Sequence, residues 1–428
     1  MKIFINTFGS YGDVQPFILL GKALKERGHT IMICTASRFE REVTAGGLEY
    51  GYITNEVLDL LDHNDRIIED SMGMIGIAKV AFKLMKIAKP LNKKMVRNAW
   101  NAAKEFEPDL VLYHLKALGA VSIAEKFEVP AIMVSLVPAL APTVEFPMFA
   151  MPKLKLGGWY NRLTYRLISL GYNSYIKDLN DIRINEMGLE KFSKGTGITA
   201  MHDKTPVPNI HAISQYVLSK PRDWPSIYTM NGYIFDEEEW KPSSTLQDFL
   251  AAGEPPVYIG FGSMSGSNPE RLTNMIIDAL SKANVRGILA TGWGGLEAME
   301  LPDNILIIEK ASHAWLFPKT AAIVHHGGAG TTAASLRAGR PTIICPFFGD
   351  QPFWGDQVVR LGVGLKVSSQ KRLKAEELAS AICKVLTDSK IQATAAALGE
   401  KIQSENGVLN AINTIEGINA DWQTKRQF

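Results

Sequence analysis

The residues best suited to chemistry follow a short apolar run near residue 325. The sequence reads His325-His326-Gly327-Gly328-Ala329-Gly330-Thr331-Thr332, and a helical pattern from Thr332 to Ala338 follows. Glycines let the backbone approach an anion, and N–H groups at a helix start carry about half a positive charge. His326 and the Thr331 hydroxyl add side-chain donors. This loop, with Gly328 and Gly330, is therefore a candidate phosphate site; a tight turn with a satisfied histidine is the alternative.

A second polar pair follows the next apolar run. Asp350 and Gln351 lie in a loop after a strand predicted at Thr342–Cys345. A carboxylate accepts hydrogen bonds, and an amide both donates and accepts them, which suits the binding of sugar hydroxyls. A turn closed by the Asp350 side chain is the other interpretation.

Two further polar residues lie near the ends of apolar runs in the first part of the chain. Asp13 ends a glycine loop that contains Gly9, Ser10 and Gly12, and His114 follows an apolar run that ends at Tyr113. In the simplest interpretation Asp13 caps the helix predicted from Pro16 to Arg27, and His114 is a core histidine.

Composition indicates an ordinary folded protein. The chain has 428 residues, 46% hydrophobic and 21% charged, which is enough for two domains and too apolar for disorder. Lys and Arg number 46 against 44 Asp and Glu, and this balance argues against a nucleic-acid partner. The cysteines at 34, 345 and 383 form no cluster, so neither a disulfide framework nor a zinc site is predicted. Because no targeting signal or bilayer-spanning run is evident, we expect a cytoplasmic protein.

Strands and helices alternate in two series. The first series has strands predicted at 2–7, 30–34, 109–113 and 130–135, and the second at 257–261, 287–290, 305–308, 322–325 and 342–345. This alternation predicts an α/β fold with parallel sheets that bind ligands at the carboxyl ends of their strands. We predict two Rossmann-like domains facing a cleft, at 1–235 and 256–405, with a linker at 236–255 and a helical tail at 406–428.

Several of these motifs together resemble one family. The run from His325 to Gln357 resembles the donor-binding signature of the nucleotide-diphospho-sugar glycosyltransferases of GT-B fold. Within them it is most similar to the sterol glucosyltransferases and related natural-product enzymes. The segment Gly9–Pro16 resembles that group's amino-terminal loop, and Trp315–Pro318 its segment before the donor motif. The resemblance implies a GT-B fold whose final helix returns to the first domain.

The resemblance also implies roles for individual residues. It places the diphosphate against His326, Gly328, Gly330, Thr331 and Ser263, the sugar hydroxyls against Asp350 and Gln351, and the uracil against the backbone around Ala311–His313. We expect UDP-glucose as co-substrate, with no cofactor and no metal, because no DxD-type motif stands where a metal would bridge the diphosphate. The base-stacking tryptophan and ribose-binding glutamate of the plant secondary-product enzymes have no counterpart here, which leaves UDP and TDP donors open.

The candidate base is the clearest departure from those plant enzymes. They place a histidine in the amino-terminal loop and orient it with a later aspartate, whereas the matching positions here hold Asp13 and His114. We hypothesise that Asp13 is the general base and that His114 is its partner. Direct displacement of the diphosphate is then expected to invert the anomeric centre.

Acceptor binding is expected in the first domain. Met85, Phe146, Phe149 and Met151 form the predicted acceptor pocket. Two stretches without acidic residues, 71–104 and 146–177, carry basic residues beside apolar ones, and Pro90 is expected to start a second helix in the first stretch. These stretches are either ordinary helices or surfaces for peripheral contact with an anionic membrane. Any such contact is expected to come from this chain itself.

Together the motifs predict an inverting hexosyltransferase that moves glucose from UDP-glucose to a hydroxyl of a hydrophobic acceptor. The acceptor expected first is a sterol-like molecule, and flavonoids, terpenoids and macrolides are the further candidates. The alternatives are a GT-B sugar-nucleotide epimerase, which would act without an acceptor, and a non-catalytic relic that binds a lipid or nucleotide sugar. The intact set Asp13, His326 and Asp350 argues against the relic. We expect a monomer or a weak dimer.

Overall fold

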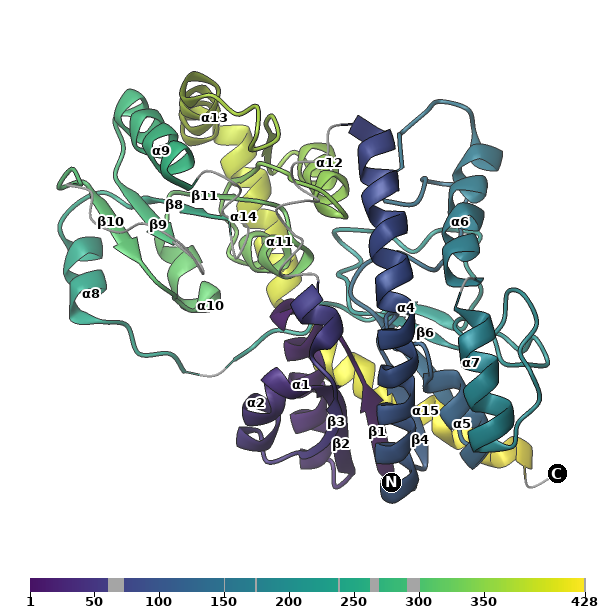
Figure 1. Ribbon diagram of the computed structural model, residues 1–428. Helices are drawn as coiled ribbons and strands as arrows, with labels where there is room; N and C mark the ends of the chain where they lie inside the picture. Colours follow the sequence, from purple (N-terminus) through teal and green to yellow (C-terminus); the bar gives the residue numbers. More distant parts are fainter. Residues whose placement is uncertain are drawn as a thin grey trace. The chain divides into compact units, whose positions relative to one another are not determined.

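The chain folds into two compact units (Figure 1). A computed structural model describes residues 1–60, 73–149, 151–173, 175–237, 239–261, 269–290 and 301–426, without the side chains of 73–88, 167–170 and 269. The first unit holds Met1–Gln215, Ser219–Phe235 and Asn406–Phe428, and the second holds Tyr216–Leu218 and Asp236–Glu405. The segment 236–255, expected to be a linker, is thus grouped with the second unit.

The first unit is built on a seven-stranded parallel sheet of order β3-β2-β1-β4-β5-β6-β7. The strands are β1 (Lys2–Asn6), β2 (Thr30–Ala36), β3 (Glu49–Ile53), β4 (Leu110–Tyr113), β5 (Ala131–Ser135), β6 (Asn209–His211) and β7 (Tyr228–Met230). Asn6 of β1 pairs with Tyr113 of β4. The strand order reverses between these two strands, which is where parallel α/β sheets bind ligands.

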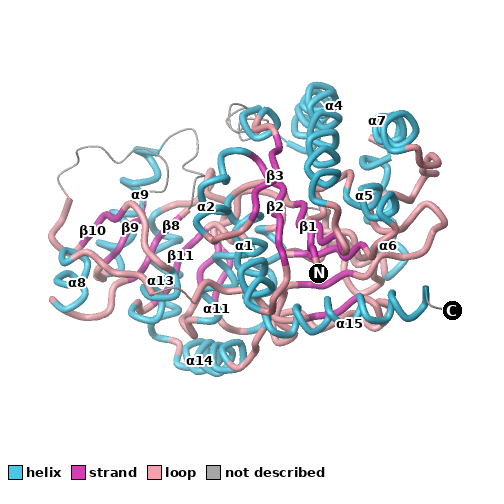
Figure 2. The backbone as a smooth tube through the Cα atoms, turned by 90° about the horizontal axis from the view of Figure 1, so that it is seen from below, coloured by secondary structure: helices cyan, strands magenta, loops and turns pink. Residues whose placement is uncertain are grey.

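Helices cover both faces of this sheet. They are α1 (Tyr11–Glu26), α2 (Glu40–Ala45), α4 (Gly73–Phe106), α5 (Ala120–Phe127), α6 (Gly158–Asn173), α7 (Ile176–Ile182) and α15 (Gly407–Arg426). Figure 2 shows α4, α5 and α7 on one side of the strands and α15 on the other. Ala411, Ile412 and Ile415 of α15 are buried in the core of the first unit. The return of the last helix to the first unit is therefore confirmed.

The second unit contains a six-stranded parallel sheet of order β10-β9-β8-β11-β12-β13. The strands are β8 (Val257–Gly260), β9 (Gly287–Ala290), β10 (Ile305–Ile308), β11 (Ala322–His325), β12 (Thr342–Ile344) and β13 (Gly364–Lys366). Its order reverses between β8 and β11, so the loop after β11 also begins at a switch point. Side chains alternate between the two faces: Val257 and Ile259 enter one core cluster, and Tyr258 enters another.

Two helical layers cover the second sheet. The helices are α8 (Ser244–Ala251), α9 (Pro269–Ala283), α10 (His313–Leu316), α11 (Ala329–Arg337), α12 (Gln351–Leu361), α13 (Ala375–Thr387) and α14 (Ser389–Gln403). Helices α9 and α13 pack together over one face, whereas α8, α10 and α11 contribute to the cluster on the other. Within the described residues, no helix combines the length and the apolar character that a membrane span requires.

Two local predictions were wrong, and the segment predicted as a linker contains a helix. Helix α1 begins at Tyr11 rather than Pro16, because Ser10 and Asp13 form a capping box ahead of the proline. Helix α4 runs through Pro90 without a break; its packing on β3 and α7 outweighs the backbone hydrogen bond that a proline removes. The segment 236–255 contains α8, whose cap Ser243 accepts a hydrogen bond from the Leu246 N–H at 3.3 Å.

Candidate functional site

Asp13 lies in the first turn of α1, just beyond the carboxyl end of β1. The Ser10 N–H donates to Oδ2 of Asp13 at 2.7 Å, and the Ser10 hydroxyl donates to the same oxygen at 2.9 Å. Gly9 has a φ of +143°, and a Cβ at this position would lie 2.1 Å from Oδ2. A side chain at Gly9 would therefore displace the carboxylate. Asp13 does cap its helix, and its side chain is still 20% exposed.

The turn after β4 brings two further side chains to this carboxylate. Nε2 of His114 lies 3.6 Å from Oδ1 of Asp13, and the Lys116 ammonium donates to Oδ2 at 2.8 Å. A hydrogen bond of 2.8 Å from the Ala117 N–H to the His114 carbonyl closes the turn. The structure thus brings Asp13 and His114 together, and it adds Lys116, which sequence analysis missed. The only sequence signal for Lys116 is its position two residues beyond His114.

Asp13 and His114 have different protonation states at neutral pH. Burial alone would raise the pKa of Asp13, but the charges of Lys116 and His114, with hydrogen bonds from Lys116 and Ser10, lower it overall. Burial lowers the pKa of His114 to about 4, against the attraction of Asp13. At neutral pH the site therefore holds a carboxylate beside an uncharged imidazole. The His114 side chain is only 2% exposed, so Asp13 is the member of the pair that an incoming group can reach.

The glycine loop of the second unit connects β11 to α11. Gly327 has a φ of +93°, and a Cβ there would lie 2.7 Å from Cγ2 of Ile344. The Gly327 N–H donates to Nδ1 of buried His325 at 3.0 Å, and Gly328 is the cap residue of α11. Gly330 is exposed, and a Cβ there would meet nothing within 4 Å. The first turn of α11, which also carries Thr331, therefore presents open space of the kind that anions occupy at helix starts.

Three histidines lie around this loop and are uncharged at neutral pH. Burial lowers the pKa of His326 and His313 to about 4 and that of His325 well below its usual range. His313 stacks on Phe317 with ring centroids 4.3 Å apart. Nδ1 of His326 is buried and makes no hydrogen bond within the described part of the chain. In this state His326 offers an N–H group to a ligand and no positive charge.

Asp350 and Gln351 begin α12. Oδ2 of Asp350 accepts a hydrogen bond from the Trp354 indole N–H at 2.8 Å. The amide oxygen of Gln351 accepts from the N–H groups of Phe347 and Phe348 at 2.6 and 3.3 Å. Gln351 is 4% exposed, so its amide oxygen shapes the loop itself, a role that sequence analysis did not predict.

The remaining predicted residues are scattered. Ala311 precedes Ser312, which caps α10 by accepting from the Trp315 N–H at 3.4 Å. Ser263 and the side chain of Met85 lie outside the described residues. Phe149 and Met151 pack in one cluster with Leu115, whereas Phe146 packs in another, with Trp224 and Tyr228.

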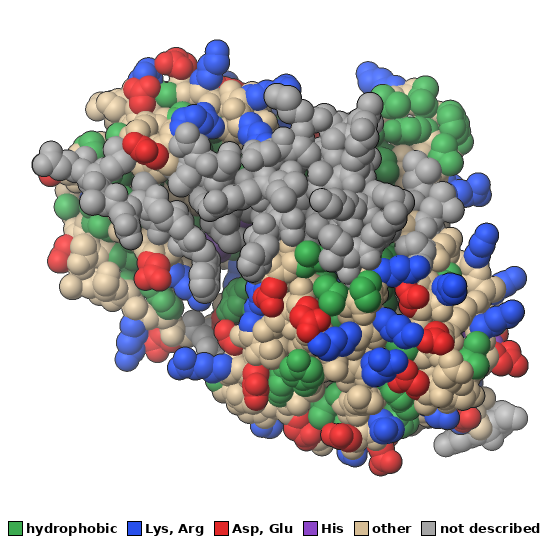
Figure 3. All heavy atoms as spheres, in the orientation of Figure 1, with side chains coloured by type: hydrophobic (Ala, Val, Ile, Leu, Met, Phe, Trp, Pro, Cys, Tyr) green, Lys and Arg blue, Asp and Glu red, His purple; other side chains and the backbone are tan. Residues whose placement is uncertain are grey.

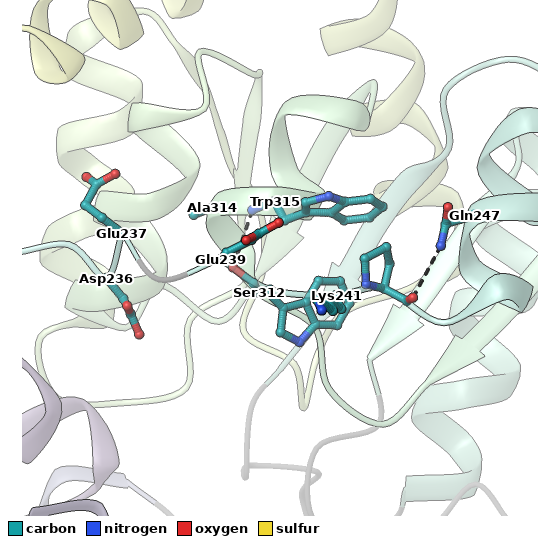
Figure 4. Close-up of a pocket in the computed structure, with 10 residues that line it drawn as sticks. Asp236, Glu237, Glu239, Lys241, Gln247, Ser312, Ala314 and Trp315 are labelled. Carbon is teal, nitrogen blue, oxygen red and sulfur yellow. Dashed lines mark hydrogen bonds between the residues drawn. The ribbon is translucent and has the colours of Figure 1, made fainter. Parts of the chain in front are cut away.

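A cavity of about 460 Å³ lies beside α10 (Figure 4). Ser312, Ala314 and the rings of Trp240 and Trp315, whose centroids are 5.4 Å apart, line it. Asp236, Glu237, Glu239 and Lys241 line it as well. Three carboxylates against one lysine repel a diphosphate, so an anionic ligand fits the glycine loop better than this cavity. The part of the chain that the structure describes holds no group of three His, Cys, Asp or Glu side chains arranged for a metal.

Two Rossmann-type sheets, each with a polar loop at its switch point, define the class: this is the GT-B fold of glycosyltransferases. The glycosyltransferase of kitacinnamycin has the same fold, with a TM-score of 0.73 at 17% identity, over 98% of this chain and 99% of that one. Glycosyltransferase VinC, solved in complex with DTDP, has a TM-score of 0.70 at 16% identity, over 98% and 100%.

Sequence comparison narrows the class to a family. Residues 3–145 match the glycosyltransferase family 28 N-terminal domain, and residues 277–414 match the erythromycin biosynthesis protein CIII-like C-terminal domain. Sterol 3-beta-glucosyltransferase UGT80B1 of Arabidopsis thaliana is 33% identical, over 96% of this chain and 67% of its own. The sterol 3-beta-glucosyltransferase of Cryptococcus neoformans var. neoformans serotype D (strain JEC21) is 34% identical, over 97% of this chain and 27% of its own.

The chain belongs to the sterol 3-beta-glucosyltransferase family of glycosyltransferases. It spans about a quarter of the length of the Cryptococcus relative, at 27%, and 67% of the Arabidopsis one.

Proposed function

We propose that this chain is an inverting glycosyltransferase that moves glucose from UDP-glucose to a hydroxyl of a hydrophobic acceptor, in the first place a sterol. The observation that carries the proposal is the accessible carboxylate of Asp13 beside the buried, uncharged His114. This pair lies at the switch point of the first unit of a chain whose relatives are named sterol 3-beta-glucosyltransferases.

In the proposed reaction, Asp13 takes the proton of the acceptor hydroxyl while that oxygen bonds to the anomeric carbon of the sugar. The bond between this carbon and the diphosphate oxygen breaks, and its electron pair leaves with UDP. One displacement converts an α-linked donor into a β-glycoside. N–H groups at the start of α11, with His326 and Thr331, stabilise the charge that develops on the diphosphate.

The acceptor assignment draws on packing around Leu115. This residue stands between His114 and Lys116 in the turn after β4, and it packs against the cluster that contains Phe149 and Met151. One turn thus joins the groups around Asp13 to predicted apolar acceptor residues. An apolar surface beside a base suits a lipophilic alcohol, because it desolvates the acceptor without competing for its hydroxyl.

The test is transfer itself. Purified protein is incubated with UDP-glucose or TDP-glucose and a sterol, a flavonol, a triterpenoid or a macrolide, and hexose addition is detected by mass. We expect addition to the sterol from UDP-glucose. Asp13→Asn, which keeps the oxygen that caps α1, should lower kcat by roughly 10²- to 10⁴-fold with an unchanged Tm.

The control for this variant is Asp59→Asn, which removes an exposed carboxylate paired with Arg38 and should leave transfer unchanged. Donor consumption without any acceptor would instead support an epimerase. Binding of UDP-glucose without any consumption would support the non-catalytic alternative.

We also propose that the first unit contacts an anionic membrane surface peripherally. Leu154, Leu156, Trp159 and Leu163 are 51, 49, 65 and 41% exposed, within the acid-free stretch 146–177. Figure 3 shows hydrophobic side chains gathered at the upper right, where Figure 1 places α6. Lys153, Lys155 and Arg166 accompany them, whereas Arg162 pairs with Asp223 at 3.0 Å. Basic residues beside exposed tryptophan and leucine favour anionic interfaces.

The four basic residues of α4 between 89 and 97 support this contact less well. Lys89, Lys93, Lys94 and Arg97 pair with Asp178, Asp181, Glu56 and Glu186, so their charge is largely compensated within the first unit. The contact is tested by co-sedimentation with phosphatidylserine-containing vesicles. Leu156→Ala combined with Trp159→Ala should weaken binding, and Leu409→Ala, an exposed leucine of α15, should not. Equal vesicle binding by the unaltered protein, the double variant and Leu409→Ala would contradict the proposed membrane contact.

A further inference from the structure

The two oxygens of Asp13 have unequal surroundings. Oδ2 accepts three hydrogen bonds, from the N–H and hydroxyl of Ser10 and from the Lys116 ammonium, at 2.7, 2.9 and 2.8 Å. Among the described residues, the polar group recorded near Oδ1 is Nε2 of His114, at 3.6 Å. A carboxylate oxygen offers about two lone-pair sites. Oδ2 is therefore saturated, whereas Oδ1 retains the capacity to accept a proton.

We propose that Lys116 is the positioning residue of the base: it anchors Oδ2, keeps the carboxylate ionised, and thereby leaves Oδ1 as the atom that takes the proton of the acceptor hydroxyl. This inference rests on the proposed role of Asp13 as general base. It assigns the two oxygens of Asp13 different tasks, one structural and one chemical.

The backbone around Lys116 is well placed for this task. The turn that carries it is closed by the Ala117–His114 hydrogen bond and follows directly from β4, whose residues are buried. Leu115 packs into the apolar cluster next to it. The position of the lysine backbone is therefore set by the sheet, and its side chain spans the gap to the loop after β1.

At neutral pH, Lys116 is also the source of positive charge at Asp13. Among the described residues, the titratable groups that face the carboxylate are Lys116 and His114, both from the turn after β4. Ser10, in the loop before α1, contributes neutral donors. His114 is uncharged at neutral pH, since burial lowers its pKa to about 4. A nearby opposite charge lowers a carboxyl pKa by roughly one to three units. Because the Lys116 side chain is 46% exposed, solvent screening favours the low end of that range.

The inference is tested by carboxyl ¹³C NMR on protein labelled at aspartate, with the Asp13 signal assigned through Asp13→Asn. Lys116→Gln should raise the titration midpoint of Asp13 by roughly one pH unit. Lys116→Arg keeps the charge and should leave the midpoint near that of the unaltered protein. Lys126→Gln, at an exposed lysine of α5, is the matched control and should change nothing.

Kinetics supply the second readout. The acid limb of kcat/KM for the sterol should move to higher pH in Lys116→Gln by the same amount as the NMR midpoint. An unchanged midpoint in a folded Lys116→Gln protein would overturn the inference, as would a lower Tm with an unshifted acid limb. The titration needs no turnover, so a shifted midpoint in a protein without detectable transfer would support the anchor and refute the proposed function.

Discussion

At the residue scale, exposure to solvent decides which side chain of the Asp13–His114 pair can reach a substrate. Asp13 and His114 are neighbours, yet only the carboxylate is accessible, because the imidazole is buried against Phe17 with ring centroids 5.8 Å apart. The depressed pKa of Asp13 has a cost, since a weaker base removes a proton less readily. It has a compensating benefit, because the carboxylate stays ionised at lower pH.

The state of His326 leads to a prediction for donor binding. Its pKa of about 4 means that it stays uncharged above roughly pH 5.5. The diphosphate of UDP-glucose keeps its charge throughout this range, so the Kd of UDP-glucose should be nearly constant from about pH 8 to pH 5.5. Calorimetry in buffers of different ionisation enthalpy measures this directly. Affinity that rises as the pH falls, with proton uptake, would mean that His326 binds as a cation.

At the element scale, each unit positions its own polar side chains at the carboxyl ends of its strands. In the first unit the turn after β4 meets the glycine loop after β1, and in the second unit a glycine loop connects β11 to α11. Short apolar runs were readable in the sequence, which is why the strands β1, β4, β8 and β11 were predicted well. Lys116 was not, because a lysine in a polar turn looks solvated until the sheet places it beside β1. Strands β3, β6, β7 and β13 were missed. Strands β6, β7 and β13 have three residues each, which is too few for a periodic pattern. Strand β12 is equally short, but it was predicted because it lies in an apolar run that continues to Cys345.

Among the helices, too, some features could be predicted from the sequence and others could not. Helix α8 was obscured by the prolines and acidic residues before it, although Ser243 ahead of an apolar pattern is a helix-start signal. The continuity of α4 through Pro90 was not readable, because it depends on packing against β3 and α7. The asymmetry between the two oxygens of Asp13 likewise requires a contact from Lys116, which lies 103 residues away in sequence.

A matched pair of glycine substitutions separates structure from binding in the loop before α11. Gly327→Ala should destabilise the second unit by about 1 to 3 kcal/mol, because it combines a positive φ with a Cβ 2.7 Å from Ile344. Gly330→Ala places its methyl group in open space inside a helix and should keep or slightly raise Tm. If the diphosphate occupies that space, Gly330→Ala should still raise the Kd of UDP-glucose by tenfold or more.

Thermal melts and calorimetry on both variants make the comparison. If Gly330→Ala has a normal Tm and a normal affinity for UDP-glucose, the proposal that the diphosphate binds at the first turn of α11 is contradicted.

At the scale of the whole molecule, buried histidines make stability depend on pH. Burial lowers the pKa of His114, His313 and His326 to about 4 and that of His211 to about 3. Unfolded histidines titrate near 6.5. Between these values the unfolded chain binds more protons than the folded one, so the free energy of unfolding falls as the pH drops from about 6.5 toward 4.

This pH dependence can be assigned with one substitution. His211 stacks on Trp224 at 4.3 Å between ring centroids, and His211→Phe keeps an aromatic ring there without a titrating group. The decrease in Tm between pH 7.5 and 4.5 should be smaller in His211→Phe than in the unaltered protein. His202→Gln, at a half-exposed histidine, should not reduce the decrease. A Tm that does not change with pH would contradict the argument.

The return of α15 has a consequence for how the chain can be cut and rejoined. Asn231 donates to the Asn410 carbonyl and to Thr414 at 3.0 and 2.8 Å, and a Cβ at Gly407 would lie 2.1 Å from the Tyr233 carbonyl oxygen. The chain thus leaves the first unit near Phe235 and re-enters it near Asn406 at adjoining points. In topological terms, residues 236–405 are an insertion nested within a host domain. We expect a short Gly-Ser bridge from 235 to 406 to close the host, and residues 236–405 to be replaceable as one segment by the matching segment of a relative.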